Sequence, residues 1–172
     1  MRKILTATAT ATAAAAALMV VGVTHAHAST TTASLAVNVT LQTNCLFTGG
    51  TVAATYVPGA GQVASTNAAA LSVACSPDTN TPTVSFGPGL VGTIGGRIAT
   101  NGTNQLAYNL YTAATGGTIL GNGTTGSTVA VAGSTIAVPK TVSVSLIVPD
   151  TAANQALPGG TYTDTVVATL TF

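Results

Sequence analysis

The sequence holds few side chains that could carry out chemistry. Its 172 residues include two cysteines, two histidines, four basic and three acidic residues, and no tryptophan. Both histidines, His25 and His27, fall in an N-terminal segment that we expect to be removed. The remaining side chains cannot assemble a usual zinc site or an activated nucleophile. We therefore expect no enzymatic activity, no metal site and no other cofactor.

The first 28 residues have the composition of a secretory signal. Two basic residues precede an apolar stretch rich in Ala and Thr, and residues 26–28 read Ala-His-Ala, a small-x-small cleavage site. An uncleaved membrane anchor is the alternative, because the stretch is about long enough to span a bilayer. Cleavage would leave Arg97 and Lys140 against three aspartates. Such a chain lacks the electrostatic footprint of a nucleic-acid binder.

The only cysteines, Cys45 and Cys75, are predicted to form a disulfide. An even number of cysteines in an exported chain favours a bridge, because the compartment is oxidising. Closing this loop should stabilise the fold by about 3.5 kcal/mol in the chain-entropy treatment. Two free buried thiols are the competing interpretation.

Apolar residues recur at every second position, which is the period of a β-strand. The main alternating runs are 35–41, 71–75, 106–110, 142–148 and 162–172, and shorter strands are expected at 51–57, 83–86 and 128–131. Gly- and Pro-rich turns such as residues 158–160 separate them. Seven or eight strands divided in this way predict an all-β fold, an antiparallel β-sandwich, in one domain.

The edges of such a sandwich have little protection. Soluble proteins guard edge strands with Lys, inward-pointing charges or Pro, and this chain offers only Lys140 and Arg97. Either bulges and loops cover the edges, or another chain pairs with them by strand addition. The residues alone leave these two alternatives open.

An ordered set of segments resembles the spore coat protein U domain family, which includes pilus subunits of archaic chaperone-usher systems. An export signal and an alternating strand lead to Cys45, and the other segments follow over nearly the whole mature chain. They are Leu71–Cys75, a Gly-rich loop into Arg97, Leu106–Tyr111, and Pro158–Val166 closing on Leu170–Phe172.

The resemblance implies an immunoglobulin-like sandwich that lacks its last strand and is completed by a donor strand from another chain. By resemblance, residues 1–28 are the signal, 29–43 the donor segment and 44–172 the pilin domain. The inserting side chains would be Leu35, Val37, Val39 and Leu41. The acceptor groove, which also contacts the chaperone, would be lined by Tyr162, Val166, Ala168, Leu170 and Phe172.

The function that the resemblance implies is that of a structural subunit of a surface pilus, supporting adhesion and biofilm formation. Its partners would be a periplasmic chaperone, an outer-membrane usher and neighbouring subunits, with no nucleic acid. A secreted spore-coat or matrix protein of the same fold is the alternative. A carbohydrate-binding module is a weaker alternative. Most tyrosines of this chain fall on strand patterns, where an aromatic residue is ordinarily part of the core.

Overall fold

The computed structural model describes residues 30–77 and 80–172, which form nine strands and one short helix. The strands are β1 (Cys45–Gly49), β2 (Val63–Cys75), β3 (Thr83–Phe86), β4 (Val91–Thr93), β5 (Gly96–Asn101), β6 (Asn104–Tyr111), β7 (Val129–Ala130), β8 (Lys140–Val148) and β9 (Ala168–Thr171). Helix α1 (Ala152–Gln155) is a single turn. No helix in this part of the chain is long and apolar enough to cross a membrane. The expected signal peptide lies outside the described residues.

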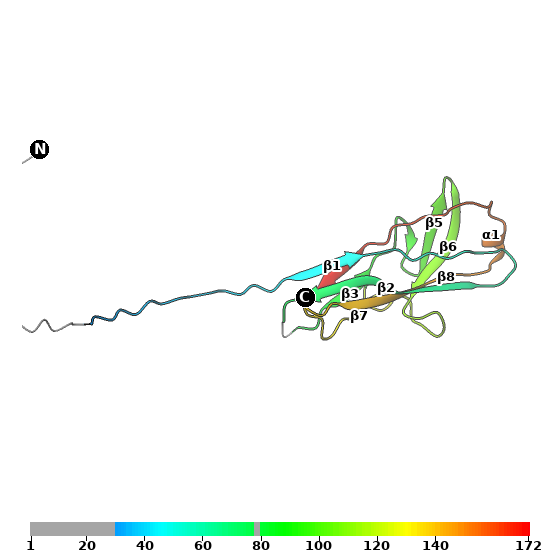
Figure 1. The fold of residues 1–172 in the computed structure, drawn as a ribbon. Helices are drawn as coiled ribbons and strands as arrows, with labels where there is room; N and C mark the ends of the chain where they lie inside the picture. Colours follow the sequence, from blue (N-terminus) through cyan, green and yellow to red (C-terminus); the bar gives the residue numbers. More distant parts are fainter. Residues whose placement is uncertain (1–29, 78–79) are drawn as a thin grey trace, which may run out of the picture. The chain divides into compact units, whose positions relative to one another are not determined.

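The strands form two antiparallel sheets (Figure 1). One sheet has six strands in the order β1-β2-β8-β6-β5-β4, and the other has three in the order β7-β3-β9. The buried core draws on both sheets, with Val73 from β2, Val84 from β3 and Val144 from β8 among its members. The predicted all-β antiparallel sandwich is confirmed, with β1 and β9 each at an edge of its sheet.

Strand β2 is divided by a bulge. Its pairing with β8 shifts register between Asn67 and Leu71, and β1 pairs only with the part after the shift. Asn67 stabilises this irregular stretch, because its side chain accepts a hydrogen bond from the N–H of Ala69 and donates one to the carbonyl of Thr51. Strand β8 pairs with β2 on both sides of the shift, and a bulge of this kind bends the strand and increases its local twist.

The strand predictions are accurate where a run finds a partner within the chain. The runs 71–75, 106–110 and 142–148 fall inside β2, β6 and β8, and the run 83–86 is β3 itself. The runs 35–41 and 51–57 have strand periodicity but form no strand. A strand needs a hydrogen-bonded neighbour, and neither segment pairs with another described segment.

Candidate strand-acceptor site

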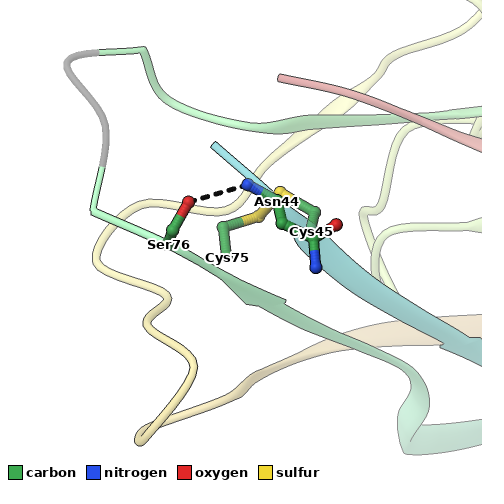
Figure 2. Close-up of a disulfide and its surroundings, with 4 residues drawn as sticks. All are labelled: Asn44, Cys45, Cys75 and Ser76. Carbon is green, nitrogen blue, oxygen red and sulfur yellow. Dashed lines mark hydrogen bonds between the residues drawn. A yellow bond between two sulfur atoms is a disulfide. The ribbon is translucent and has the colours of Figure 1, made fainter. Parts of the chain in front are cut away.

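The disulfide joins the start of β1 to the end of β2 (Figure 2). Cys45 and Cys75 lie directly opposite each other in the antiparallel ladder, with their Cα atoms 4.0 Å apart. One step beyond, the N–H of Asn44 donates to Ser76 Oγ at 2.8 Å and the N–H of Ser76 donates to the carbonyl of Asn44 at 2.7 Å. The predicted bridge is confirmed, and it fixes the point at which the chain enters the sandwich.

Two chain segments carry apolar side chains that pack on the core without being fully buried. The first row comes from β1 and the residues after it, and the second row comes from the C-terminal segment. The first row is Cys45, Phe47, Val52 and Tyr56, and the second is Tyr162, Val166, Ala168 and Leu170. Residues between them in sequence are exposed, apart from Ala54 in the first segment and Asp164 in the second. We call these two sets the open rows, since no described strand covers them.

The second open row contains four of the five residues predicted to line an acceptor groove. Of this row, Ala168 and Leu170 lie in β9, which pairs with β3 on one side only. The fifth residue, Phe172, follows β9 and is about half exposed. The sequence analysis did not predict the first open row. In the structure, its side chains from Phe47 to Tyr56 are as incompletely buried as those of the second row.

The predicted donor side chains are among the most exposed apolar residues described. Leu35, Val37, Val39 and Leu41 are 87%, 73%, 86% and 88% exposed. Residues 30–43 lie in no helix or strand. All of residues 30–43 are exposed, so what distinguishes these four is their apolar alternation, which is the period of a strand.

A carboxylate holds the end of the first open row that lies away from the disulfide. Asp150 accepts hydrogen bonds from the Tyr56 hydroxyl at 2.5 Å, from the N–H groups of Gly59 and Gly61, and from the Gln155 side chain. The hydrogen bond from Tyr56, followed by that from Gln155, lowers the pKa of Asp150 to about 2. Desolvation, with the bond to Asp150, raises the pKa of Tyr56 to about 12. We call this group of contacts the Asp150 anchor.

A second polar group ties the second open row to the rest of the core. Asp164 accepts hydrogen bonds from the Tyr108 hydroxyl at 2.6 Å and from the N–H groups of Leu90 and Thr165. Gly89 has φ +94°, and a Cβ there would overlap the Asp164 carboxylate. Burial and the bond to Asp164 raise the pKa of Tyr108. The glycine-rich loop is therefore built around Asp164.

Arg97 is fully buried beside this group, which the sequence did not indicate. Its guanidinium donates to the carbonyls of Gly87 and Leu120 at 2.7 and 2.8 Å, and also to the carbonyl of Ile94 and the Asn109 side chain. Burial lowers the pKa of Arg97. Asp164 thus organises a loop, whereas Arg97 crosslinks three chain segments inside the core.

A hollow of about 260 Å³ lies at the disulfide end. It is bounded by the disulfide, Phe172, Ser76 and Ser134. No group of three or more His, Cys, Asp or Glu side chains suited to a metal ion occurs in residues 30–77 and 80–172. What the region offers is unpaired edges and half-covered apolar side chains, which can bind a polypeptide strand by main-chain pairing and side-chain insertion.

Comparison with known proteins agrees with this geometry. The Spore Coat Protein U domain model matches residues 31–169. The chain belongs to the Spore Coat Protein U domain family. The resemblance drawn from the sequence is thereby confirmed, and the match spans the first open row, the second open row up to Ala168, and all four exposed alternating residues. No curated protein matches this Spore Coat Protein U domain chain.

Among solved structures, this Spore Coat Protein U domain chain is similar to one from archaic chaperone-usher Csu pili of Acinetobacter baumannii, in the crystal structure of the CsuC-CsuE chaperone-tip adhesion subunit pre-assembly complex. The TM-score is 0.53 at 21% sequence identity, and the match covers 77% of this chain and 40% of that one. The chain therefore spans less than half the length of the protein it matches. At this identity the likeness shows the shared fold.

Proposed function

We propose that the protein is a structural subunit of a surface pilus, exported through the periplasm and assembled by donor-strand exchange. In this proposal residues 1–28 are the signal peptide, 29–43 the donor segment and 44–172 the acceptor domain. The fibre supports adhesion and biofilm formation, and the subunit itself needs no cofactor. Membership of the Spore Coat Protein U domain family supports a structural rather than a catalytic role.

The observation that carries the proposal is a match between two exposed features of one chain. Leu35, Val37, Val39 and Leu41 alternate with polar or small residues and are exposed, while the open rows hold apolar side chains that no described strand covers. A segment of one copy inserted between the rows of another would bury both sets. Each fully buried aliphatic side chain contributes about 1.5–3 kcal/mol, main-chain pairing adds affinity, and the apolar alternation sets the register.

Unassembled subunits would need protection, because exposed apolar rows and free strand edges promote aggregation. A periplasmic chaperone that covers the open rows, including Tyr162, Val166, Ala168, Leu170 and Phe172, would provide it. The solved structure with the similar fold belongs to a complex of a chaperone and a tip adhesion subunit from chaperone-usher pili. That likeness supports a chaperone and an outer-membrane usher as partners here.

The test is an SDS gel of material sheared from the cell surface, loaded unheated and boiled with the reductant held constant. We expect a ladder that collapses to the monomer only on boiling, because an inserted strand is kinetically trapped. The variant Val37→Asp with Val39→Asp should abolish the ladder. The matched control, Ala36→Asp with Asn38→Asp, adds the same charge on the opposite strand face and should retain it.

Two results would count against the proposal. If the variant Val37→Asp with Val39→Asp still gave a ladder, these two residues would not insert into the neighbouring subunit. A wild-type monomer band in both lanes would mean a self-sufficient sandwich, and the coat or matrix role would then take its place.

A further inference from the structure

Strand β8 covers only part of the edge of its neighbour β6. The ladder between them pairs Asn109 with Ile147, and the same register continued would place Ala107 opposite Pro149. Proline has no backbone N–H group, so it cannot donate a hydrogen bond to the carbonyl of Ala107. The main chain of β8 therefore leaves part of the β6 edge without a partner.

A side chain of helix α1 occupies this gap. Asn154 Oδ1 accepts a hydrogen bond from the N–H of Ala107 at 3.0 Å, and Asn154 Nδ2 donates one to the carbonyl of Ala107 at 3.0 Å. Nδ2 also donates to the carbonyl of Pro149 at 2.8 Å. A carboxamide carries an N–H donor and a carbonyl acceptor, as the main chain does. Asn154 therefore makes both bonds that a residue of a paired strand would make.

Local structure holds the Asn154 side chain at this edge. Asn154 is 2% exposed, and its own N–H donates to Oγ1 of Thr151, the N-cap residue of α1. Figure 1 shows α1 at the end of the sheet where β6 and β8 lie. A single helical turn is not stable by itself in water, so contacts such as those of Asn154 keep α1 against the sheet.

Without Asn154 this stretch of β6 would be a second place at which the sheet could capture a strand. Free N–H and C=O groups on a strand edge are a template for pairing with another chain. Gln105 is the next residue of β6 whose backbone faces the same edge, because the facing residues alternate, and the turn into β5 follows it. Asn154 therefore closes all but the last position of the β6 edge.

The β6 edge differs from the open rows in what a bound strand would gain. The open rows offer half-covered apolar side chains in addition to free strand edges. At the β6 edge, Gln105 and Ala107 present an exposed polar and an exposed small side chain. A strand bound there would gain main-chain pairing without the side-chain pockets that select a partner. An unguarded β6 edge would therefore pair with little discrimination.

We propose that Asn154 is an edge guard, which takes the place of a strand residue and keeps β6 from pairing with the same edge of a second copy of this chain. Two copies of residues 105–107 related by a two-fold axis can pair antiparallel, with Gln105 of each opposite Ala107 of the other. The guard goes beyond the proposed strand exchange and does not depend on it. Its effect is to direct strand pairing to the open rows.

Cross-linking between two copies tests the guard. The unassembled chain carries Val37→Asp with Val39→Asp, so that the donor segment does not contribute, and two differently tagged populations, one with Gln105→Cys and one with Ala107→Cys, are mixed under mild oxidation. With Asn154→Ala in both, we expect reductant-sensitive heterodimers, because hydrogen-bonded antiparallel pairs have Cα atoms about 5.5 Å apart, within disulfide range. With Asn154 intact the yield should be about tenfold lower, since pairing must first break the bonds of Asn154.

Two further variants separate an open edge from a general loss of stability. Leu110→Ala weakens the core and leaves Asn154 in place, so it should not raise the yield of heterodimers. Thr151→Ala removes the N-cap of α1 at an exposed position and leaves no cavity, so it should raise the yield, though less than Asn154→Ala does. If Asn154→Ala does not fold, Thr151→Ala decides the question in its place.

Amide exchange shows whether the edge has opened. The N–H of Ala107 should exchange at least about tenfold faster in Asn154→Ala, while that of Val144 is unchanged. If the Ala107 amide is exposed and the yield of heterodimers does not rise, Asn154 only fastens α1 and the guard is overturned. Equal yields from Leu110→Ala and Asn154→Ala would overturn it as well. A wild-type chain without a heat-sensitive ladder would overturn the proposed function alone.

Discussion

The sandwich has a closed region and an open region that share one sequence pattern. In the closed region, alternate residues of β2, β3 and β8 such as Val73, Val84 and Val142 are almost completely buried. In the open rows, side chains such as Phe47 in the first row and Leu170 in the second pack on the same core and remain partly exposed. The alternation therefore specifies which face of a segment is apolar. Full burial depends on whether a neighbouring strand is present.

The two regions also use their polar side chains differently. In the closed region, Arg97 is fully buried and joins the carbonyls of Gly87, Ile94 and Leu120. At the open rows, Asp150 and Asp164 are only partly buried and accept hydrogen bonds from the backbone N–H groups of loops. A buried donor set is costly to disrupt because its acceptors lose water as well as their partner, whereas a partly exposed carboxylate can be replaced by water.

The largest effect is expected from Arg97→Met. Three backbone carbonyls and Asn109 would lose a donor inside the core, so we expect a loss of more than about 4 kcal/mol in the free energy of unfolding. Urea unfolding of the purified chain measures this loss. If the variant does not accumulate in cells at all, the loss is larger than the stability of the wild type. Lys140→Met is the control, because Lys140 is exposed. Equal unfolding midpoints for the two variants would contradict the role of Arg97.

The disulfide is expected to rank second. Replacing both cysteines, Cys45→Ser with Cys75→Ser, should lower the free energy of unfolding by about 3.5 kcal/mol, because the unfolded chain regains the freedom of the closed loop. Urea unfolding of the oxidised wild type and the variant measures the difference. Ser76→Ala, which removes only the bond to the N–H of Asn44, should cost much less. If reductant destabilised the double variant as much as the wild type, the bridge would not be the cause.

The third prediction compares the two regions with one substitution. Leu110, almost completely buried, and Leu170, in the second open row, present the same side chain to the same core. In the unassembled chain we expect Leu110→Ala to cost about 3 kcal/mol and Leu170→Ala about 1 kcal/mol, because a partly exposed leucine loses fewer contacts. Urea unfolding gives both values. Equal costs would mean that the second row is already covered.

The sequence could predict what depends on local pattern. The runs 71–75, 83–86 and 142–148 each show the strand period and each lies within a strand, although β2 begins at Val63, well before the first of these runs. The disulfide followed from there being two cysteines, Cys45 and Cys75, in a chain expected to be exported. The four exposed residues were named as donor side chains through the family resemblance, with which their strict alternation agrees, and their insertion into another chain stays a proposal.

Long-range polar contacts could not be predicted in this way. Tyr56 and Asp150 are far apart in sequence, and neither stands in a motif that pairs tyrosine with aspartate. The burial of Arg97 depends on three carbonyl groups that converge only once β5 and two loops are in place. Ser134 lies in a polar loop and resembles any surface serine until the fold encloses it. The first open row was missed because residues 51–57 show strand periodicity without a partner.

The smallest effect concerns the Asp150 anchor and depends on pH. The pKa of Asp150 in the folded chain is lowered from 3.8 to about 2, so the anchor contributes stability above about pH 4 that is lost as the pH falls toward 2. We expect the urea midpoint of the wild type to fall more steeply across this window than that of Asp150→Asn, which has no carboxylate to protonate. Because Asp164 is common to both chains, the difference between the two profiles isolates Asp150.

The anchor holds one end of the first open row, so its release by acid should be local. Amide exchange of Gly59 and Gly61, whose N–H groups donate to Asp150, should become faster as the pH falls through this window, after correction for intrinsic rates, while exchange of Val144 in the closed region stays slow. Tyr56→Phe, which removes the first hydrogen bond to Asp150, should produce part of this change already at neutral pH. If acid accelerated exchange equally in both regions, the open row would be held by the whole fold rather than by its anchored end. The distinction between the two regions would then be one of burial alone.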